Sequence, residues 1–472
     1  MKKLFVWSQS IFAKALMLGL LLLLLCIPLG QIQSLIAERG QSASDAAQEL
    51  AATYVGPQTL LGPLLQVPYV ERWQTREPGE KGQPERLVEH SAERVALWFP
   101  QQWTLDGDMT PEQRYRGLFT VLFYRLGGSV QGSFAPFDTR LLVQHEKNSR
   151  IEVGTPVLTL HVSDLRGLQG APKLTLAGQT LAFQRQAPGL DPRHPLSSGV
   201  HAPLAGPALD AFRAGQPLPF TLALTLLGQQ SLNIVPLGDD TDAHLRSSWP
   251  HPSFGGRFLA AERTISAQGF DARWRIAALT SQTREQLRAL APADNPARAD
   301  AAGLDNVEAF YVSFVQPVNV YSMADRAVRY GFLFIVLTLM AVLMVELFAR
   351  LRLHPVQYAL VGLSIAVFFL LLIALSEKIG FTAAYAGAAG ASVALLAVYF
   401  SAVLRSLKRA LMLAGFVALL YAALYGLLAS ESNALMLGAL LVFGMLAALM
   451  LATRHTDWWS LGGNGADAPP AP

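Results

Sequence analysis

The stretch "VELFARLRLHPVQYALVG", residues 345–362, lies between two segments that are apolar almost throughout. A glutamate, two arginines and a histidine–proline pair follow one another closely before the sequence becomes apolar again. Two interpretations fit such a cluster. It is either an active site inside a membrane or a loop where the chain turns round at a membrane surface. The choice decides whether the chain is treated as an enzyme, a transporter or a structural membrane component.

The composition of the whole chain points to the membrane. Of its 472 residues, 52% are hydrophobic and only 15% are charged, whereas charged residues make up about 25% of a typical soluble domain. The formal net charge of +3 is too small to suggest a nucleic-acid partner. The single Cys26 excludes an internal disulfide. The expected partner is therefore the lipid bilayer.

Six segments are apolar over the length of about 20 residues that a helix needs to cross the hydrocarbon core. They are residues 12–36, 330–348, 356–375, 381–401, 410–429 and 434–452. The first segment has no convincing cleavage site after its apolar core, so we expect it to remain as a transmembrane helix. The chain is thus predicted to cross the membrane six times.

The orientation follows from the short loops, where lysine and arginine collect on the cytoplasmic side. These residues gather at the amino end and in alternate loops: Lys2, Lys3, Lys14, Arg350, Arg352, Arg405, Lys408, Arg409 and Arg454. The pattern predicts a multi-pass protein of the bacterial inner membrane with residues 1–11 and the tail 453–472 in the cytoplasm. The tail is expected to be disordered, and residues 37–328 are expected to be periplasmic.

The exported segment 37–328 is predicted to form a β-rich, sandwich-like domain. Strands of about five to nine residues alternate with stretches rich in Gly and Pro, a spacing that suits antiparallel hairpins. The strand candidates are "TPVLTLHVSDL", "PKLTLAGQTLAFQ", "FTLALTLLGQQSLNIVPLG", "RTISAQGFDARWRIAAL" and "NVEAFYVSFVQPVNVY". Gly40 is expected to end the first helix before a polar, Ala-rich helix. The fold class is α+β: one amino-terminal transmembrane helix, this domain, and a carboxy-terminal five-helix transmembrane bundle within residues 330–452.

The sequence contains no strong catalytic or cofactor-binding motif. His244 and His251 are a close pair of histidines in the exported segment, but a seven-residue gap broken by proline is not a recognised metal-ligand spacing. We expect Trp249, His251 and Phe254 to form an aromatic-rich turn that packs on the sheet. No catalytic residue, cofactor or metal is predicted.

Glu346 is the one charge placed inside an apolar run, and an unpaired carboxylate there costs several kcal/mol. Arg350 follows four residues later on the same helix face, which allows an ion pair with both side chains reaching toward the headgroups. That structural interpretation is favoured. A proton or substrate relay and recognition of a partner remain as alternatives.

The other polar residues of the bundle are given structural interpretations. Glu377 lies in the short turn "SEKIG" on the outer surface, where charges are ordinarily solvated. Tyr385 needs a hydrogen-bond partner. Ala383, Gly387 and Ala391 recur at four-residue intervals, a spacing that predicts a helix-packing seam.

The motifs and their order resemble the CreD family of bacterial inner-membrane proteins over nearly the whole chain. The resemblance rests on "GPLLQVPY", "WPHPSFGGRFL", "YSMADRAVRYGFLFIVLT", "HPVQYALVG" and "LLIALSEKIGFTAAY". The positions that these motifs and Glu346 single out are Trp249, His251, Tyr321, Asp325, Arg326, Glu346, Arg350, His354, Pro355, Tyr358, Glu377 and Tyr385. The resemblance implies a role in cell-envelope integrity, a link to a two-component stress regulon, colicin tolerance and responses to envelope-acting antibiotics. It implies no catalytic residue.

The resulting expectation is a protein that supports the cell envelope through periplasmic interactions rather than catalysis. Its expected partners are the bilayer and periplasmic or inner-membrane envelope proteins, and the sequence does not decide its oligomeric state. One rival is a transporter of amphipathic or lipid-like molecules. A second is a membrane enzyme, which predicts that Asp325, Arg326 and Arg329 line a cavity.

Overall fold

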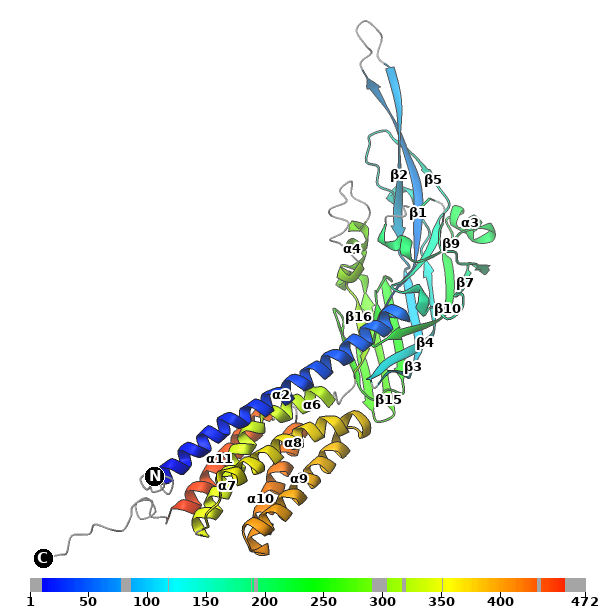
Figure 1. The fold of residues 1–472 in the computed structure, drawn as a ribbon. Helices are drawn as coiled ribbons and strands as arrows, with labels where there is room; N and C mark the ends of the chain where they lie inside the picture. Colours follow the sequence, from blue (N-terminus) through cyan, green and yellow to red (C-terminus); the bar gives the residue numbers. More distant parts are fainter. Residues whose placement is uncertain are drawn as a thin grey trace, which may run out of the picture. The chain divides into compact units, whose positions relative to one another are not determined.

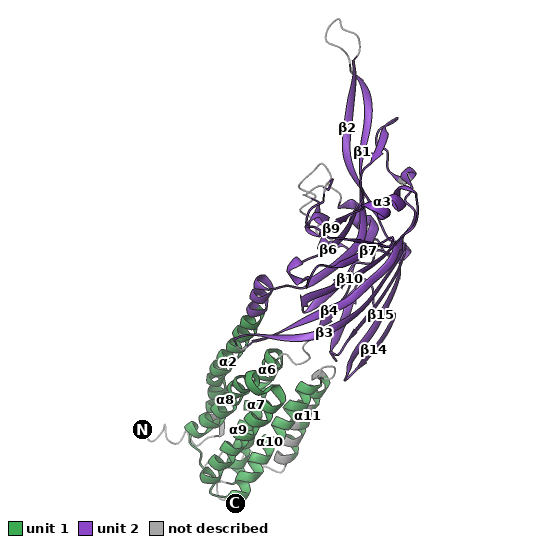
Figure 2. Ribbon diagram, turned by 90° about the vertical axis from the view of Figure 1, so that its right-hand side faces the viewer, with its two compact units in different colours: residues 1–44, 318–472 green, residues 45–317 purple. Residues whose placement is uncertain are grey.

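The structure is a computed structural model that describes residues 11–77, 86–117, 119–187, 189–190, 194–290, 304–315, 320–349, 351–430 and 434–454. The chain forms two compact units (Figure 2). The helical unit comprises residues 1–44 and 318–472, and the sheet unit comprises residues 45–317. Residues 1–10 and nearly all of the predicted tail lie outside the described residues.

Each apolar segment predicted from the sequence is a helix (Figure 1). The helices are α2 (Ile11–Thr53), α6 (Val320–Arg329), α7 (Gly331–Phe348), α8 (Pro355–Ile379), α9 (Phe381–Val403), α10 (Leu407–Ala429) and α11 (Ala434–Thr453). Within the described residues, α2, α7, α8, α9 and α10 are long and apolar enough to cross a membrane. Helix α11 covers the sixth predicted segment.

The prediction that Gly40 ends the first helix is wrong. Helix α2 continues through Gly40 to Thr53 as one helix of 43 residues. A lone glycine inside a helix costs only about 1 kcal/mol relative to alanine, and good helix formers follow it in this sequence. Residues of α2 up to Ser44 belong to the helical unit, and the later ones belong to the sheet unit.

Two boundaries also differ from the prediction: the turn between α8 and α9, and the carboxy-terminal limit of the sheet unit. The expected turn "SEKIG" is mostly helix, because α8 continues to Ile379 and only Gly380, at φ 78°, separates it from α9. The sheet unit ends at Pro317 rather than near residue 328. The motif after it forms α6, which buries Ala324 and Ala327 against the other helices.

Helix α9 buries a different face from the one predicted. Ala384, Ala388 and Ser392 are buried, whereas Ala383 and Ala391 are exposed on the outside of the helical unit. The small residues expected to form a seam are therefore exposed, and they approach another helix only at its margin, where Ala391 lines a groove shared with α8.

The sheet unit contains two eight-stranded sheets (Figure 1). The first has the order β13-β16-β11-β1-β6-β9, with β2 and β5 also paired to β1, and the second has the order β14-β15-β12-β3-β4-β10-β7-β8. The strands are β1 (Gln58–Glu77), β2 (Arg86–Trp98), β3 (Gln102–Arg116), β4 (Phe119–Phe134), β5 (Arg150–Val153), β6 (Val157–Val162), β7 (Lys173–Leu176), β8 (Gln179–Leu181), β9 (Val200–Pro203), β10 (Leu218–Gln229), β11 (Ser231–Ile234), β12 (Asp240–Ser247), β13 (Pro252–Gly256), β14 (Glu262–Ser266), β15 (Gly269–Ala277) and β16 (Phe310–Phe314). Two short helices, α3 (Gly206–Arg213) and α4 (Thr283–Ala289), accompany them.

Two expectations about these strands need correction. The predicted antiparallel pairing is only part of the arrangement, because β1 pairs with β11 and β3 pairs with β12 in parallel. Strand β1 also has 20 residues, far beyond the predicted lengths. Strand β1 is this long because it pairs with several partner strands along its length. The local alternation of apolar and polar residues does not predict those partners.

One hydrophobic core joins the two sheets. Leu65 from β1 and Leu105 from β3 belong to the same buried cluster, together with Trp274 from β15. The indole N–H of Trp103 donates to the carbonyl of Gly62, 2.9 Å away, and so bonds one sheet to the other in the interior. The core is built by side chains that alternate inward along the strands.

Candidate functional site

Among the described residues of the helical unit, the most deeply buried charge is the carboxylate of Glu346, in the last turn of α7. Its side chain is 1% exposed. The Lys14 ammonium of α2 lies 2.5 Å from Glu346 Oε1, and the backbone N–H of Leu353 donates to the same oxygen at 3.2 Å. The hydroxyl of Tyr358 in α8 donates to Oε2. One carboxylate thus holds α2, α7 and α8 together.

The loop sequence after α7 positions these groups. His354 is the N-cap of α8: its Nδ1 accepts from Val356 N–H at 3.3 Å, and its own N–H donates to the Gln357 side chain at 2.8 Å. Pro355 occupies the first helical position, where its missing N–H costs little. Tyr358 follows one turn into α8 and is buried against Glu346. The motif "HPVQY" is therefore a helix start that aims a tyrosine at the carboxylate.

The predicted Glu346–Arg350 pair lies partly outside the described residues, because Arg350 is not among them. The observed partners of Glu346 are three groups that sequence spacing did not reveal. The carboxylate is also enclosed by protein, whereas the sequence predicted that it reaches toward the headgroups. Charge pairing was the right physical requirement, and the structure meets it with Lys14.

A second carboxylate cluster lies at the other end of α8. The Glu377 side chain is 9% exposed, so it is not the solvated turn residue expected from the sequence. Its Oε1 accepts from the Tyr321 hydroxyl of α6 at 3.3 Å and lies 3.9 Å from Arg39 Nε of α2. A cation of α2 again meets a buried glutamate and a tyrosine. Lys14 and Arg39 are 25 residues apart, about 37 Å along a helix.

The other motif residues of α6 face outward. Asp325 is half-buried and pairs with Arg329, its oxygen 2.6 Å from Arg329 Nη2, and it accepts from the Gln33 amide at 3.4 Å. Arg326 and Arg329 are exposed. The bond between Asp325 and Gln33 adds to the contact of α6 with α2, and none of these residues comes together with Glu346.

Tyr385 belongs to a separate aromatic group. It is buried in α9, and its hydroxyl donates to the backbone carbonyl of Tyr421 in α10 at 2.7 Å. The Tyr421 hydroxyl bonds Ser392 at 2.9 Å. The hydrogen-bond partner that the sequence required for Tyr385 is therefore a neighbouring helix backbone.

Trp249 and His251 belong to the sheet unit and not to the helical unit. The Trp249 indole N–H donates to the carbonyls of His251 and Val315, each at 3.1 Å, and its ring lies edge-on to His251. Phe254 packs on Phe270. The predicted aromatic turn is confirmed for Trp249 and Phe254, while the His251 side chain is exposed. No cluster that could hold a metal ion occurs among the described residues.

The sheet unit has its own buried carboxylate, which the sequence reasoning missed. Glu71 of β1 is fully buried and accepts from His145 N–H at 2.9 Å, Glu146 N–H at 3.0 Å and the Ser149 hydroxyl at 2.7 Å. Arg94 donates to its other oxygen at 3.1 Å. Burial alone raises the pKa of Glu71, but these hydrogen bonds together lower the pKa to about 2. No local pattern marks Glu71, because its partners come from a loop distant in sequence.

The comparisons with known proteins agree with the motifs. The sequence profile of the family described as "Inner membrane protein CreD" matches residues 10–459, which include both carboxylate clusters. The chain is also similar to the inner membrane protein CreD of Escherichia coli (strain K12). The two are 34% identical over 439 residues, which cover 93% of this chain and 91% of that protein. On this evidence the chain belongs to the CreD family of inner membrane proteins.

Proposed function

We propose that the protein supports cell-envelope integrity and the envelope-stress response by presenting the sheet unit to the periplasm, where it interacts with envelope components. The helical unit anchors it in the inner membrane, with both termini in the cytoplasm. Lysine and arginine concentrate in the loops after α7 and α9, which supports this orientation. No catalysis is part of the proposal.

The observation that carries an anchoring role is the way the buried charges of the helical unit are used. Glu346 and Glu377 each bind a cation of α2 and a tyrosine hydroxyl. A carboxylate held by such partners is tied into the packing of the helices, which stabilises the contact of α2 with the bundle. A binding function then falls to the sheet unit, which holds more than half of the chain.

Reporter fusions test the orientation directly. A reporter after about residue 200 is expected to be active in the periplasm, and one after about residue 353 is expected to be active in the cytoplasm. Fusions that report the same side at both positions overturn the proposed topology, since an odd number of spans must separate them.

In-cell crosslinking from the sheet unit tests the proposed interaction. Photo-reactive residues at the exposed side chains of Leu87, Tyr115 and Leu259 are expected to capture envelope components. The buried Leu105 gives a matched control that must capture nothing beyond the chain itself. A species that is captured from the exposed positions in wild-type cells, and is missing from a strain with altered tolerance to colicins or antibiotics, supports the role. Identical patterns of captured species from all four positions contradict it.

The transporter rival makes a different prediction for Glu346. In the anchoring role, Lys14→Met or Glu346→Gln strands a buried charge or its partners and lowers stability by on the order of 3 kcal/mol. The double variant then recovers much of this loss. In a relay, Glu346→Gln leaves the protein level unchanged and abolishes the envelope phenotype.

Two measurements distinguish these outcomes: the amount of each variant protein in the membrane, and the tolerance of the cells to envelope-acting antibiotics. Arg329→Gln is the matched control, because its pair with Asp325 is exposed and such pairs contribute at most about 1 kcal/mol. If protein level and phenotype are both unchanged in Glu346→Gln, neither a relay nor the anchoring role of this carboxylate survives.

The enzyme rival required Asp325, Arg326 and Arg329 to line a cavity. Both arginines are exposed, and Asp325 is occupied by Arg329 and Gln33. The arrangement favours a surface ion pair on α6 over a reaction centre.

A further inference from the structure

We propose that a groove between α8 and α9 binds one acyl chain of an anionic phospholipid, whose headgroup is held by Arg352 and Arg405. The inference deepens the proposed function and rests on it in one respect, the membrane placement of these helices. It assigns a lipid site to the bundle that is separate from both carboxylate clusters.

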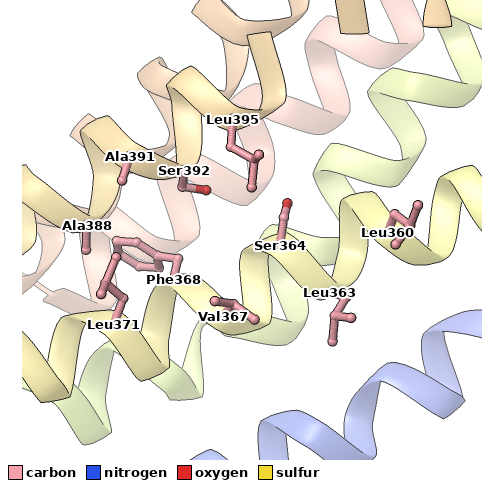
Figure 3. Close-up of a pocket in the computed structure, with 10 residues that line it drawn as sticks. All are labelled: Leu360, Leu363, Ser364, Val367, Phe368, Leu371, Ala388, Ala391, Ser392 and Leu395. Atoms are coloured by element: carbon pink, nitrogen blue, oxygen red, sulfur yellow. The ribbon is translucent and has the colours of Figure 1, made fainter. Parts of the chain in front are cut away.

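The groove has the surface that a hydrocarbon chain requires. It holds about 290 Å³ and is lined by Leu360, Leu363, Ser364, Val367, Phe368, Leu371, Ala388, Ala391, Ser392 and Leu395 (Figure 3). Leu395 is 60% exposed at its rim, so the groove opens outward. Small side chains of α9 make room opposite the larger side chains of α8.

The two hydroxyls in the groove do not call for a polar ligand. Ser364 Oγ donates to the carbonyl of Val361 at 2.8 Å, and Ser392 Oγ bonds the Tyr421 hydroxyl at 2.9 Å. Both groups are thus engaged by the protein itself. What remains available to an occupant is apolar surface, which a methylene chain covers without losing a hydrogen bond.

The length of the groove matches one leaflet of the bilayer. From Leu360 to Leu371 it follows about 16 Å of α8, and one leaflet supplies about half of the 30 Å hydrocarbon core. The groove begins about one and a half turns after the start of α8. An acyl chain entering from that end therefore has its ester region near the loops.

Charge complementarity identifies the class of lipid. Helices α8 and α9 are antiparallel neighbours joined at Gly380, so the start of α8 and the end of α9 lie at the same end of the groove. Arg352 precedes α8 and Arg405 follows α9, and both are exposed. Neither has an ion-pair partner among the described residues. Lys408 and Arg409 add positive charge to the second loop, and together these residues favour a phosphate-bearing anionic headgroup.

A second copy of the chain is the competing occupant. The exposed Ala383, Gly387 and Ala391 of α9 have the spacing of a helix-dimer face. A helix docked there would cover part of the same groove, but it would leave the two arginines without anions. The charge at the groove end is the reason to favour lipid.

Native mass spectrometry of the purified full-length protein in detergent tests the proposal, with phosphatidylglycerol and phosphatidylcholine of identical chains as probes. Ala391→Phe fills the groove from α9, and Ser364→Leu fills it from α8. Ala394→Phe is the matched control, because Ala394 is exposed on the same helix but does not line the groove. Arg352→Gln with Arg405→Gln removes the headgroup charge, and Arg454→Gln is its charge control.

The wild type is expected to bind one phosphatidylglycerol more tightly than phosphatidylcholine. Either filling variant should weaken that binding at least tenfold at an unchanged melting temperature, and Ala394→Phe should not. Each arginine removed should weaken phosphatidylglycerol binding about fivefold and leave phosphatidylcholine binding unchanged.

Equal binding of the two lipids, or equal effects of Ala391→Phe and Ala394→Phe, overturns the proposal. So does a dimer that Ala391→Phe converts to a monomer, which assigns the groove to a second copy. Binding in detergent does not depend on which side of the membrane the loops face, so this result is separable from the reporter-fusion test.

Discussion

At the scale of single residues, buried carboxylates show how each unit tolerates charge in its interior. Glu346 receives a lysine, a tyrosine and a backbone N–H, and Glu71 receives an arginine, a serine and two backbone N–H groups. An ionised carboxylate can stay buried only when several donors satisfy its oxygens. Both sites meet that condition, and each draws at least one donor from a distant part of the sequence: Lys14 for Glu346, and the loop around His145 for Glu71.

The Glu71 site gives a stability prediction with a defined pH dependence. Glu71→Gln should lower the free energy of unfolding of the sheet unit by on the order of 3 kcal/mol at pH 7. The folded pKa of about 2 lies below the unfolded value of about 4.5, so the carboxylate contributes its full stability above pH 4.5. That contribution is lost as the pH falls toward 2.

Chemical denaturation of the full-length protein, followed by tryptophan fluorescence at pH 7, 4.5 and 3, measures the difference between wild type and variant. The difference should shrink between pH 4.5 and 3. Glu152→Gln is the matched control, since Glu152 is exposed beside Arg72 and should change stability little at any pH. A constant difference across the three pH values would show that the pKa of Glu71 is the same in the folded and unfolded states, which contradicts the prediction.

At the scale of elements, α2 is the clearest departure from local expectation. A glycine and a polar stretch favoured a break, but the helix continues to Thr53, because one glycine costs a helix only about 1 kcal/mol. A Cβ at Gly40 would lie 3.6 Å from Tyr321 Cβ, an ordinary contact. Gly362, at the end of the stretch 345–362, shows the opposite case: a Cβ there would meet Leu25 Cδ1 at 2.2 Å, so α2 and α8 approach closely at that point.

The continuity of α2 can be tested at Gly40. Gly40→Ala should raise stability by up to about 1 kcal/mol, because alanine favours the helix, and Gly40→Pro should lower it by about 3 kcal/mol. Thermal unfolding in detergent, followed by circular dichroism at 222 nm, measures both.

Gly380→Ala serves as the contrast for this pair of variants. Gly380 has φ 78°, where a side chain is strained, so alanine there should destabilise. A break at Gly40 would reverse the expectation: proline would be tolerated, and alanine would bring no gain.

At the scale of the whole molecule, the two units have separate hydrophobic cores. The main core of the sheet unit lies between the two sheets. In a smaller cluster, Leu50 near the end of α2 and Tyr54 just after it pack beside Phe123. The Gln229 amide also donates to the Ala47 carbonyl at 3.0 Å. The sheet unit therefore includes the last turns of α2 as a structural part.

A fragment of residues 45–317 should consequently fold as a soluble domain when exported to the periplasm, with one cooperative thermal transition. A fragment of residues 57–317 lacks the cover over Phe123 and should be less stable by about 2 kcal/mol or more. Differential scanning calorimetry of the two purified fragments measures this difference. Aggregation of the longer fragment, or equal melting of both, contradicts the independence of the unit or the role of the α2 end.

The sequence by itself determined the positions of the apolar helices, the loops rich in arginine and lysine, and the family motifs. These follow from runs of neighbouring residues, because a membrane-crossing helix must satisfy its backbone within one continuous segment. Several strands of the sheet unit were visible for the same local reason, such as β6 and β15 in their apolar, alternating stretches.

Only the tertiary structure decided which groups meet. Lys14 and Glu346 are 332 positions apart, and no spacing rule connects them. The parallel pairs of β1 with β11 and β3 with β12, and the donors around Glu71, depend equally on distant segments. A buried charge needs a partner, but the sequence predicts only that a partner is needed and not which residue it is. The packing of α2 against α7 and α8 decides that Lys14 meets it, and so connects the stretch 345–362 to α2.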